Sequence, residues 1–126
     1  MEKGQTQKSP NNLEFHVLLS NFKQEVEDRK HLFQQRGETL REREKKLKQT
    51  IGLGKEIESC IVDRLMTLGE EGNKFIEDKI LLPLRQRIID LQHELLILQQ
   101  ELIIICMLKR SNTEVLGEIL RALSLV

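Results

Sequence analysis

The chain of 126 residues lacks tryptophan and tyrosine, and only 3% of its residues are aromatic. It also lacks net charge, because 20 Lys and Arg residues balance 20 Asp and Glu residues. Phosphate binding is driven by clustered cations, so this balance argues against a general attraction to nucleic acid or anionic lipid. We therefore expect no nucleic-acid partner. The charged fraction of 32% is high and is typical of long, solvated helices.

Cysteine is scarce, and its placement indicates free thiols. Cys60 and Cys106 lie far apart, in no spacing that suits a metal or a redox motif. The polar residues 1–10 lack the apolar core of a secretory signal. We expect reduced thiols in a cytoplasmic or nuclear protein, with the Cys106 thiol buried in the apolar run around it.

Long uninterrupted apolar runs are absent too. The most apolar stretch, residues 95–108, is cut by Gln99, Gln100 and Glu101 and is shorter than the ~20 apolar residues of a membrane span. We therefore expect no integral membrane segment, and we expect protein to cover this stretch.

No group of side chains suits catalysis. His16, His31 and His93 are scattered, and none lies in a recognisable motif with a nucleophile and an orienting group. Gly52 and Gly54 do not form a phosphate-binding loop, because the other glycines of that motif are missing. We expect no enzymatic activity, catalytic residue, cofactor, metal or small-molecule substrate.

Glycines and caps divide the chain into helices. Residues 1–11 are polar and without apolar periodicity, so we expect a disordered tail followed by a single helical coiled-coil domain at 12–126. Glycine pairs at 52/54 and 69/72 predict two breaks, and Ser111 with Glu114 matches a capping box. The predicted helices are about 12–50, 55–68, 73–110 and 112–125.

In the first predicted helix, large apolar residues recur at alternating heptad spacings. The register includes Phe15, Leu19, Phe22 and Val26 and continues to Leu47. This register also places three arginines on the inward face: Arg29, Arg36 and Arg43. We therefore expect a loosely packed seam.

The third predicted helix carries the strongest heptad pattern, running from Leu81 to Ile105. Pro83 lies inside it and predicts a kink or restart near Leu82. A second apolar row widens this face beyond what one partner helix can cover. That row contains Ile89, Leu96 and Ile103, together with Ile97, Ile104 and Leu108.

These patterns predict an all-α fold: a long antiparallel helical hairpin or coiled coil with a short connecting helix and a C-terminal helix, completed as a bundle by oligomerisation. The expected function is a non-enzymatic scaffold or adaptor that binds itself or another coiled-coil protein. The predicted interface residues are Leu84, Ile88, Leu91, Leu95, Leu98, Leu102, Ile105, Leu116 and Leu120.

Residues 22–51, rich in Arg, Glu and Lys with recurring Leu, resemble segments of ciliary and cytoskeletal coiled-coil proteins. This resemblance implies a cytoskeletal, centrosomal or ciliary setting and assigns no role to an individual residue.

A shorter resemblance supports an alternative function. The segment Ile61, Leu65, Leu68, Gly69 and Glu70 resembles the helix by which pro-apoptotic death-motif proteins occupy the groove of their pro-survival relatives. It implies a regulatory ligand whose helix 57–73 inserts into a partner. Gly72 stands where that pattern has its fourth apolar anchor.

Overall fold

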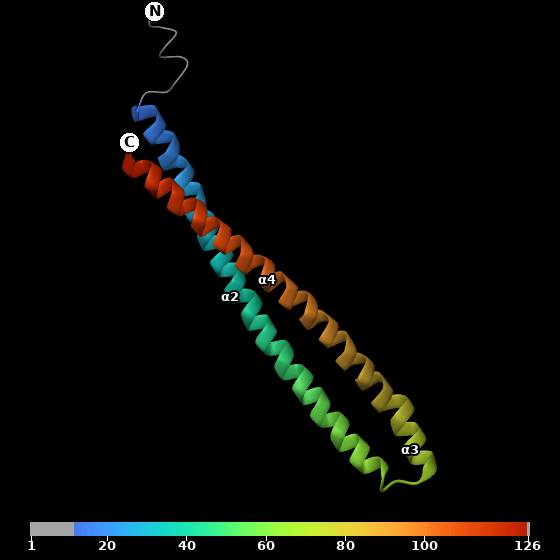
Figure 1. Ribbon diagram of the computed structural model, residues 1–126. Helices are drawn as coiled ribbons and strands as arrows, with labels where there is room; N and C mark the ends of the chain where they lie inside the picture. The colour runs from blue at the N-terminus through green and yellow to red at the C-terminus, as the bar shows by residue number, and fades with distance from the viewer. Residues whose placement is uncertain (1–11, 126) are drawn as a thin grey trace, which may run out of the picture. The chain divides into compact units, whose positions relative to one another are not determined.

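The computed structural model describes residues 12–125, and the predicted tail at 1–11 lies outside the described residues. The described chain contains α2 (Asn12–Leu65), α3 (Glu70–Ile76), the π-helix η1 (Glu77–Leu81) and α4 (Leu82–Leu125), and no strand. α3, η1 and α4 follow one another without interruption (Figure 1). The predicted all-α helical hairpin is therefore confirmed.

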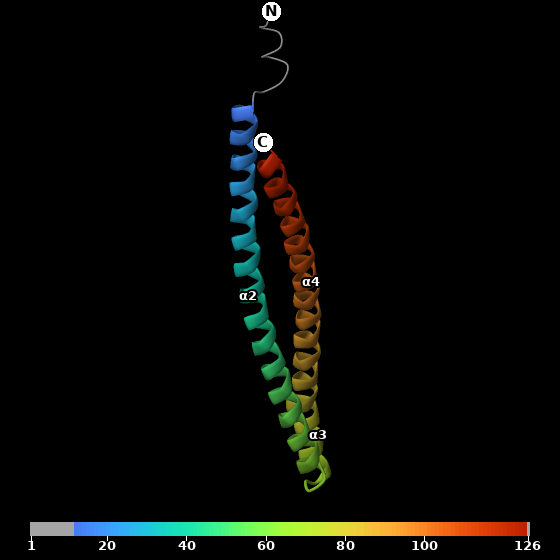
Figure 2. The same cartoon turned by 60° about the vertical axis from the view of Figure 1, so that its left-hand side comes forward.

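The helices contribute to two compact units. The first unit is Met1–Glu38 with Ile104–Val126, and the second unit is Thr39–Ile103. In each unit a part of α2 lies beside a part of α4, and the two run in opposite directions (Figures 1 and 2).

The second unit is held by a seam of apolar side chains at heptad spacing. On α2 the buried residues are Leu40, Leu47 and Ile51. Large side chains of α4 pack into this seam, and fully burying each one stabilises the fold by about 1.5–3 kcal/mol. The buried residues that face them are Leu81, at the end of η1, and Ile88, Leu91 and Leu98 of α4.

Polar pairs between α2 and α4 flank this seam and set its register. Arg85 Nε donates to Glu58 Oε2 at 2.7 Å, and Gln99 Nε2 donates to Glu44 Oε2 at 3.2 Å. Toward the turn, a Cβ at Gly54 would lie 3.0 Å from Ile88 Cγ1. The three pairings match one antiparallel alignment of α2 and α4 to within one residue. The polar pairs beside the seam and the apolar contact in it therefore have the same register.

The first unit is built in the same way, and a polar side chain of α4 bonds to the backbone of α2 in its seam. Val26, Ile105 and Ile119 are buried. Asn112 Nδ2 donates to the carbonyl oxygen of Val26 at 2.8 Å, which joins α4 to α2. A Cβ at Gly37 would lie at an ordinary contact distance, 3.6 Å, from Ile105 Cγ2. This unit therefore pairs through fewer large apolar residues.

The break predicted at Gly52 and Gly54 is absent, because α2 continues from Asn12 to Leu65. Each glycine costs a helix about 1 kcal/mol relative to alanine, but the seam runs through this region. Ile51 is buried immediately before the glycines, and Gly54 takes a seam position against Ile88. Packing against α4 therefore overrides the local signal, and the predicted short helix 55–68 is the end of α2.

Gly52 is expected to be a site where alanine stabilises the protein. It lies within α2, and nothing within 4 Å would meet its Cβ. Gly52→Ala should therefore raise the free energy of unfolding by about 1 kcal/mol, the difference in helix propensity. Urea unfolding followed by circular dichroism measures this change. An unchanged or lower midpoint would contradict the prediction.

The predicted register of α2 consists of two stripes of residues spaced seven apart. Only the stripe that contains Leu40 and Leu47 is buried. Leu40 and Leu47 are buried as expected, but Phe15 and Phe22 are exposed. The three arginines expected inside also lie on the exposed side: Arg29, Arg36 and Arg43. The second stripe instead contains Gly37, Glu44 and Ile51. Gly37 and Glu44 are small or polar, so the spacing of large apolar side chains along α2 pointed to the wrong second stripe.

The predicted end of a helix at Arg110 and the capping box at Ser111 are also wrong, because α4 continues to Leu125. Thr113 Oγ1 donates to the Lys109 carbonyl four residues back, at 2.9 Å, which a threonine in a helix interior commonly does. The seam continues beyond Asn112 through half-buried Leu116 to buried Ile119. Continued packing on α2 explains why the helix does not stop.

The irregularity expected near Pro83 is a π-helical turn that lies immediately before α4, at Glu77–Leu81. Leu81 is buried and Ile76, five residues earlier, is half-buried. A regular helix would place Glu77 in that inward position, whereas the wider π turn adds one residue and leaves Glu77 exposed. The π turn thus keeps two apolar side chains on the inner face.

Candidate functional site

The outward face of α4 in the second unit is unusually apolar. Four residues spaced seven apart, which we call the outer row, are exposed: Leu82, Ile89, Leu96 and Ile103. Residues seven apart share one face of a helix that follows a heptad repeat. The outer row lies on the side opposite Leu91 and Leu98, which are buried in the seam. It is therefore an apolar surface that α2 does not cover.

Ile97 widens the outer row and is 60% exposed. Leu96 and Ile103 are 57% and 61% exposed, so the apolar side chains of this part of α4 point well into solvent. Single exposed apolar residues are ordinary on a protein surface, but several on one face of a helix are typical of a place where another surface binds. The outer row is the candidate site in the second unit.

The predicted interface residues lie mainly in the inner seam rather than on the outer row. Ile88, Leu91, Leu98 and Ile105 are buried, and Leu120 is exposed. The other four are half-buried: Leu84, Leu95, Leu102 and Leu116. Contacts of α2 glycine positions with Ile88 and Ile105 show that this seam is filled within the chain. The apolar row that α2 leaves uncovered is the second row that the sequence indicated at Ile89, Leu96 and Ile103.

The first unit has exposed apolar residues on its own part of α4. Ile104, Met107 and Leu108 are exposed there. A shallow groove in the same unit is lined by seven residues: Leu19, Phe22, Glu114, Val115, Glu118, Ile119 and Ala122. The Glu118 carboxylate in this groove is already paired within the chain, 3.5 Å from Arg121 Nη1.

Cys106 does not lie where the sequence predicted. Both cysteines are free, as expected, but Cys60 and Cys106 are both exposed. Position 106 follows Ile105, which is buried in the seam, so its side chain is turned away from α2. The expected burial of Cys106 is therefore wrong.

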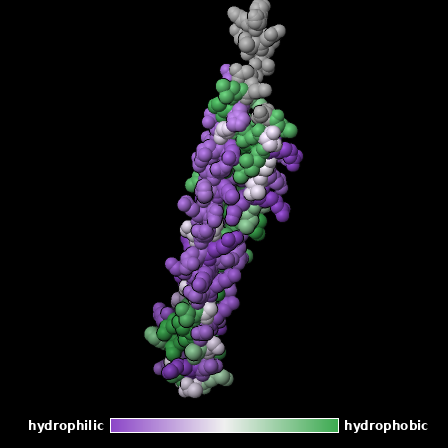
Figure 3. Space-filling view, turned by 90° about the vertical axis from the view of Figure 1, so that its left-hand side faces the viewer, coloured by the Kyte–Doolittle hydropathy of each residue, from purple (hydrophilic) through white to green (hydrophobic). Residues whose placement is uncertain are grey.

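The segment with a death-motif resemblance does not form one helix. α2 ends at Leu65, the chain turns, and Glu70 begins α3. Ile61 and Leu65 are half-buried on α2, whereas Leu68 and Gly69 lie exposed in the turn. A groove ligand presents its anchors on a continuous helical face, which this arrangement does not supply. Hydrophobic surface gathers near the turn (Figure 3), where Met66, Leu68 and Phe75 are exposed.

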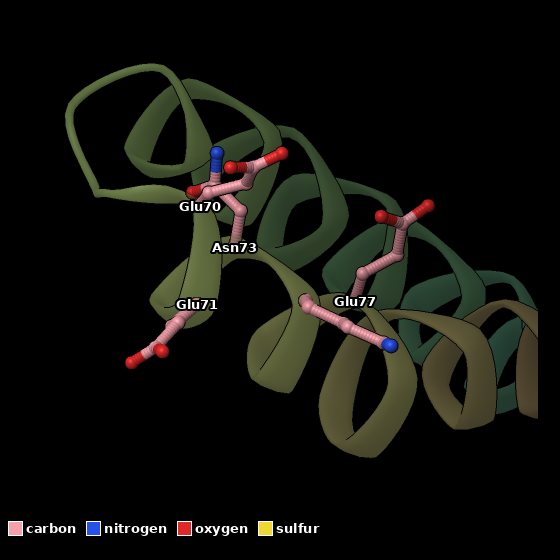
Figure 4. Close-up of a pocket in the computed structure, with 5 residues that line it drawn as sticks. Glu70, Glu71, Asn73 and Glu77 are labelled. Carbon is pink, nitrogen blue, oxygen red and sulfur yellow. The ribbon is translucent and has the colours of Figure 1, made fainter.

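A shallow pocket beside the turn is acidic. Glu70, Glu71, Asn73, Lys74 and Glu77 line it. Figure 4 shows Glu70, Asn73 and Glu77 on one side of the ribbon, with Glu71 directed away from them. No group of three or more His, Cys, Asp or Glu side chains among the described residues could hold a metal ion. We therefore assign no ligand to this pocket.

The helix Glu70–Leu125 contains a stretch that is long and apolar enough, by length and composition, to cross a membrane, with only 17% of it buried. The core helix of a soluble protein can pass the same test. Here Glu94 and Glu101 stand within the apolar part, and a carboxylate at the centre of a bilayer costs about 2.5–3.5 kcal/mol on insertion scales. Lipid is thus an alternative to protein as the partner of the exposed apolar face of α4.

No family model, curated protein or solved structure matches the chain.

Proposed function

We propose that this chain is a non-enzymatic coiled-coil scaffold or adaptor that assembles with other helices through the outer row of α4. The partner is a second copy or another coiled-coil protein. The observation that carries this proposal is the exposure of Leu96 and Ile103 on the face of α4 opposite its seam with α2.

Energetics favour a helical partner for this surface. Fully burying an exposed Leu or Ile contributes about 1.5–3 kcal/mol. The four side chains of the outer row are already about half covered, so burying the rest supplies roughly half of that range for each one and offsets part of the cost of association. A second helix covers such a row by inserting its own side chains between them, as in a coiled coil. We place the protein in the cytoplasm, in a cytoskeletal or centrosomal setting. The free thiols Cys60 and Cys106 agree with a reducing compartment.

The test is a charged variant of the outer row, Leu96→Glu with Ile103→Glu. The matched control is Leu53→Glu with Ile57→Glu, since these α2 residues are exposed to a similar extent, 60% and 53%. We expect the wild type and the control to have a molar mass above the 14.8 kDa of one chain, or to retain a shared helical partner on affinity purification. The outer-row variant should lose both while keeping its helical circular dichroism, because its changes lie outside the seam.

Three results would contradict the proposal. One is a wild type that stays monomeric at about 100 µM and retains no partner that depends on the outer row. Another is equal loss of assembly in the control variant. The third is co-sedimentation of the wild type with neutral lipid vesicles that the outer-row variant abolishes, which would assign the row to a membrane instead.

A further inference from the structure

The outer row is one half of a second heptad seam on α4. Three polar residues stand between its four apolar ones, so the spacing alternates between four and three residues throughout. All seven side chains are exposed, and all lie in the second unit: Leu82, Gln86, Ile89, His93, Leu96, Gln100 and Ile103. At 1.5 Å per residue this seam extends over about 32 Å of helix. It has the length and spacing of a coiled-coil interface of three heptads.

The order of apolar and polar residues distinguishes the two ways in which identical seams can pair. In a parallel, in-register pair each residue faces its own counterpart, so Leu96 meets Leu96 of the second copy and Gln100 meets Gln100. In an antiparallel pair the two kinds of seam position face each other. Each Leu or Ile would then lie opposite a Gln or His. The Gln or His would be buried without a hydrogen-bond partner, which costs free energy. The pattern therefore favours parallel pairing.

Charges beside the seam favour the same arrangement. In a parallel pair, the residue before one polar seam position lies opposite the residue five places later on the other helix. Arg85 of one copy then faces Asp90 of the second copy, and the symmetry repeats this pair on the other side. The remaining flanking positions of this seam carry no charge, since they are Pro83, Gln92, Ile97, Gln99 and Ile104. No like charges oppose each other.

Both members of this pair keep capacity for a second contact. Arg85 Nε donates to Glu58 within its own chain at 2.7 Å, and its side chain is 45% exposed. A guanidinium has four further N–H donors. Asp90 accepts from Gln86 through Oδ1 at 3.0 Å, and its carboxylate has a second oxygen.

We propose that the outer face of α4 pairs with the same face of a second copy, in parallel and in register, as a two-fold symmetric dimer. Gln86, His93 and Gln100 form polar layers that fix the register, as single polar residues do in coiled coils at a cost in stability. This inference rests on the proposed function, and it narrows the partner from any helix to a second copy of this chain.

Disulfide trapping tests the register. In a background of Cys60→Ser and Cys106→Ser, single variants Gln86→Cys, His93→Cys and Gln100→Cys are oxidised mildly. A parallel, in-register pair brings each residue close to its counterpart, within the roughly 4.4–6.8 Å between Cα atoms that a disulfide needs. The control is Gln49→Cys, an exposed residue of α2 in the same unit. We expect all three variants to form covalent dimers at least tenfold faster than the control.

The outcomes separate this inference from the proposed function. If the unoxidised background protein is a dimer by sedimentation but at most one of the three positions cross-links faster than the control, parallel pairing is wrong while assembly stands. If the background protein is a monomer at about 100 µM, a second copy is not the occupant. Affinity purification then tests the proposed function. If the wild type retains no partner that the outer-row variant loses, the proposed function is also wrong.

Discussion

Replacing Leu98 with glutamate is expected to destabilise the second unit strongly, whereas the same change at Leu96, two residues away, leaves its stability nearly unchanged. Leu98 is 4% exposed in the seam with α2, and Leu96 is 57% exposed on the outer row. An uncompensated buried charge costs about 3–5 kcal/mol, a large fraction of the 5–15 kcal/mol that stabilises an ordinary domain. No such cost applies to a carboxylate that stays in water.

The measurement is urea unfolding of both variants at one protein concentration, followed by circular dichroism. Leu98→Glu should unfold at a much lower urea concentration than the wild type, and Leu96→Glu should unfold at nearly the wild-type concentration. If Leu98→Glu unfolded at the wild-type urea concentration, the assignment of inner and outer faces of α4 would be incorrect. A comparable loss of helix in both variants would mean that the outer row also supports the fold of the single chain.

The close approach of α2 and α4 at Gly54 gives the second large effect. A Cβ there would lie 3.0 Å from Ile88 Cγ1 and 3.3 Å from Ile88 Cδ1, so a leucine has no room. Gly54→Leu should lower the free energy of unfolding by about 1–3 kcal/mol through overpacking. Ile88→Ala should lower it by about 2–5 kcal/mol through the cavity it leaves.

Combined, Gly54→Leu and Ile88→Ala should cost less than the sum of the two single changes, because the new leucine occupies the space that isoleucine leaves. A double-mutant cycle measures this coupling from the four urea curves. Strict additivity would show that Gly54 and Ile88 do not meet. Gly52→Leu in place of Gly54→Leu is the control, since nothing within 4 Å would meet a Cβ at Gly52 and no coupling to Ile88 is expected.

The hairpin and the seam of α4 could be predicted from the sequence because large apolar residues mark them directly. Leu91, Leu98 and Ile105 recur every seven residues, and all three are buried. The second stripe of α2 could not be found in this way. Gly37 and Glu44 have no apolar side chain to reveal them, and the exposed Phe22 produced a competing register.

Predictions of where helices end failed for another reason. Gly52, Gly54 and the Ser111 capping box are local signals worth about 1 kcal/mol each, and packing over many residues outweighs them. For the candidate site, the sequence indicated both apolar rows of α4 but could not tell which one faces α2. That choice depends on contacts such as the one between Asn112 and the Val26 carbonyl, which join residues far apart in the chain.

The π turn at Glu77–Leu81 also determines where the chain length can change. It holds one residue more than an α-helical turn, so removing a single residue from it would place Ile76 and Leu81 four apart, still on one face. The same deletion between Ile88 and Ile105 would rotate everything beyond it by about 100° and carry one half of the seam away from α2. Variation in length among natural or engineered versions of this chain is therefore best tolerated at the π turn, which can absorb a change of phase.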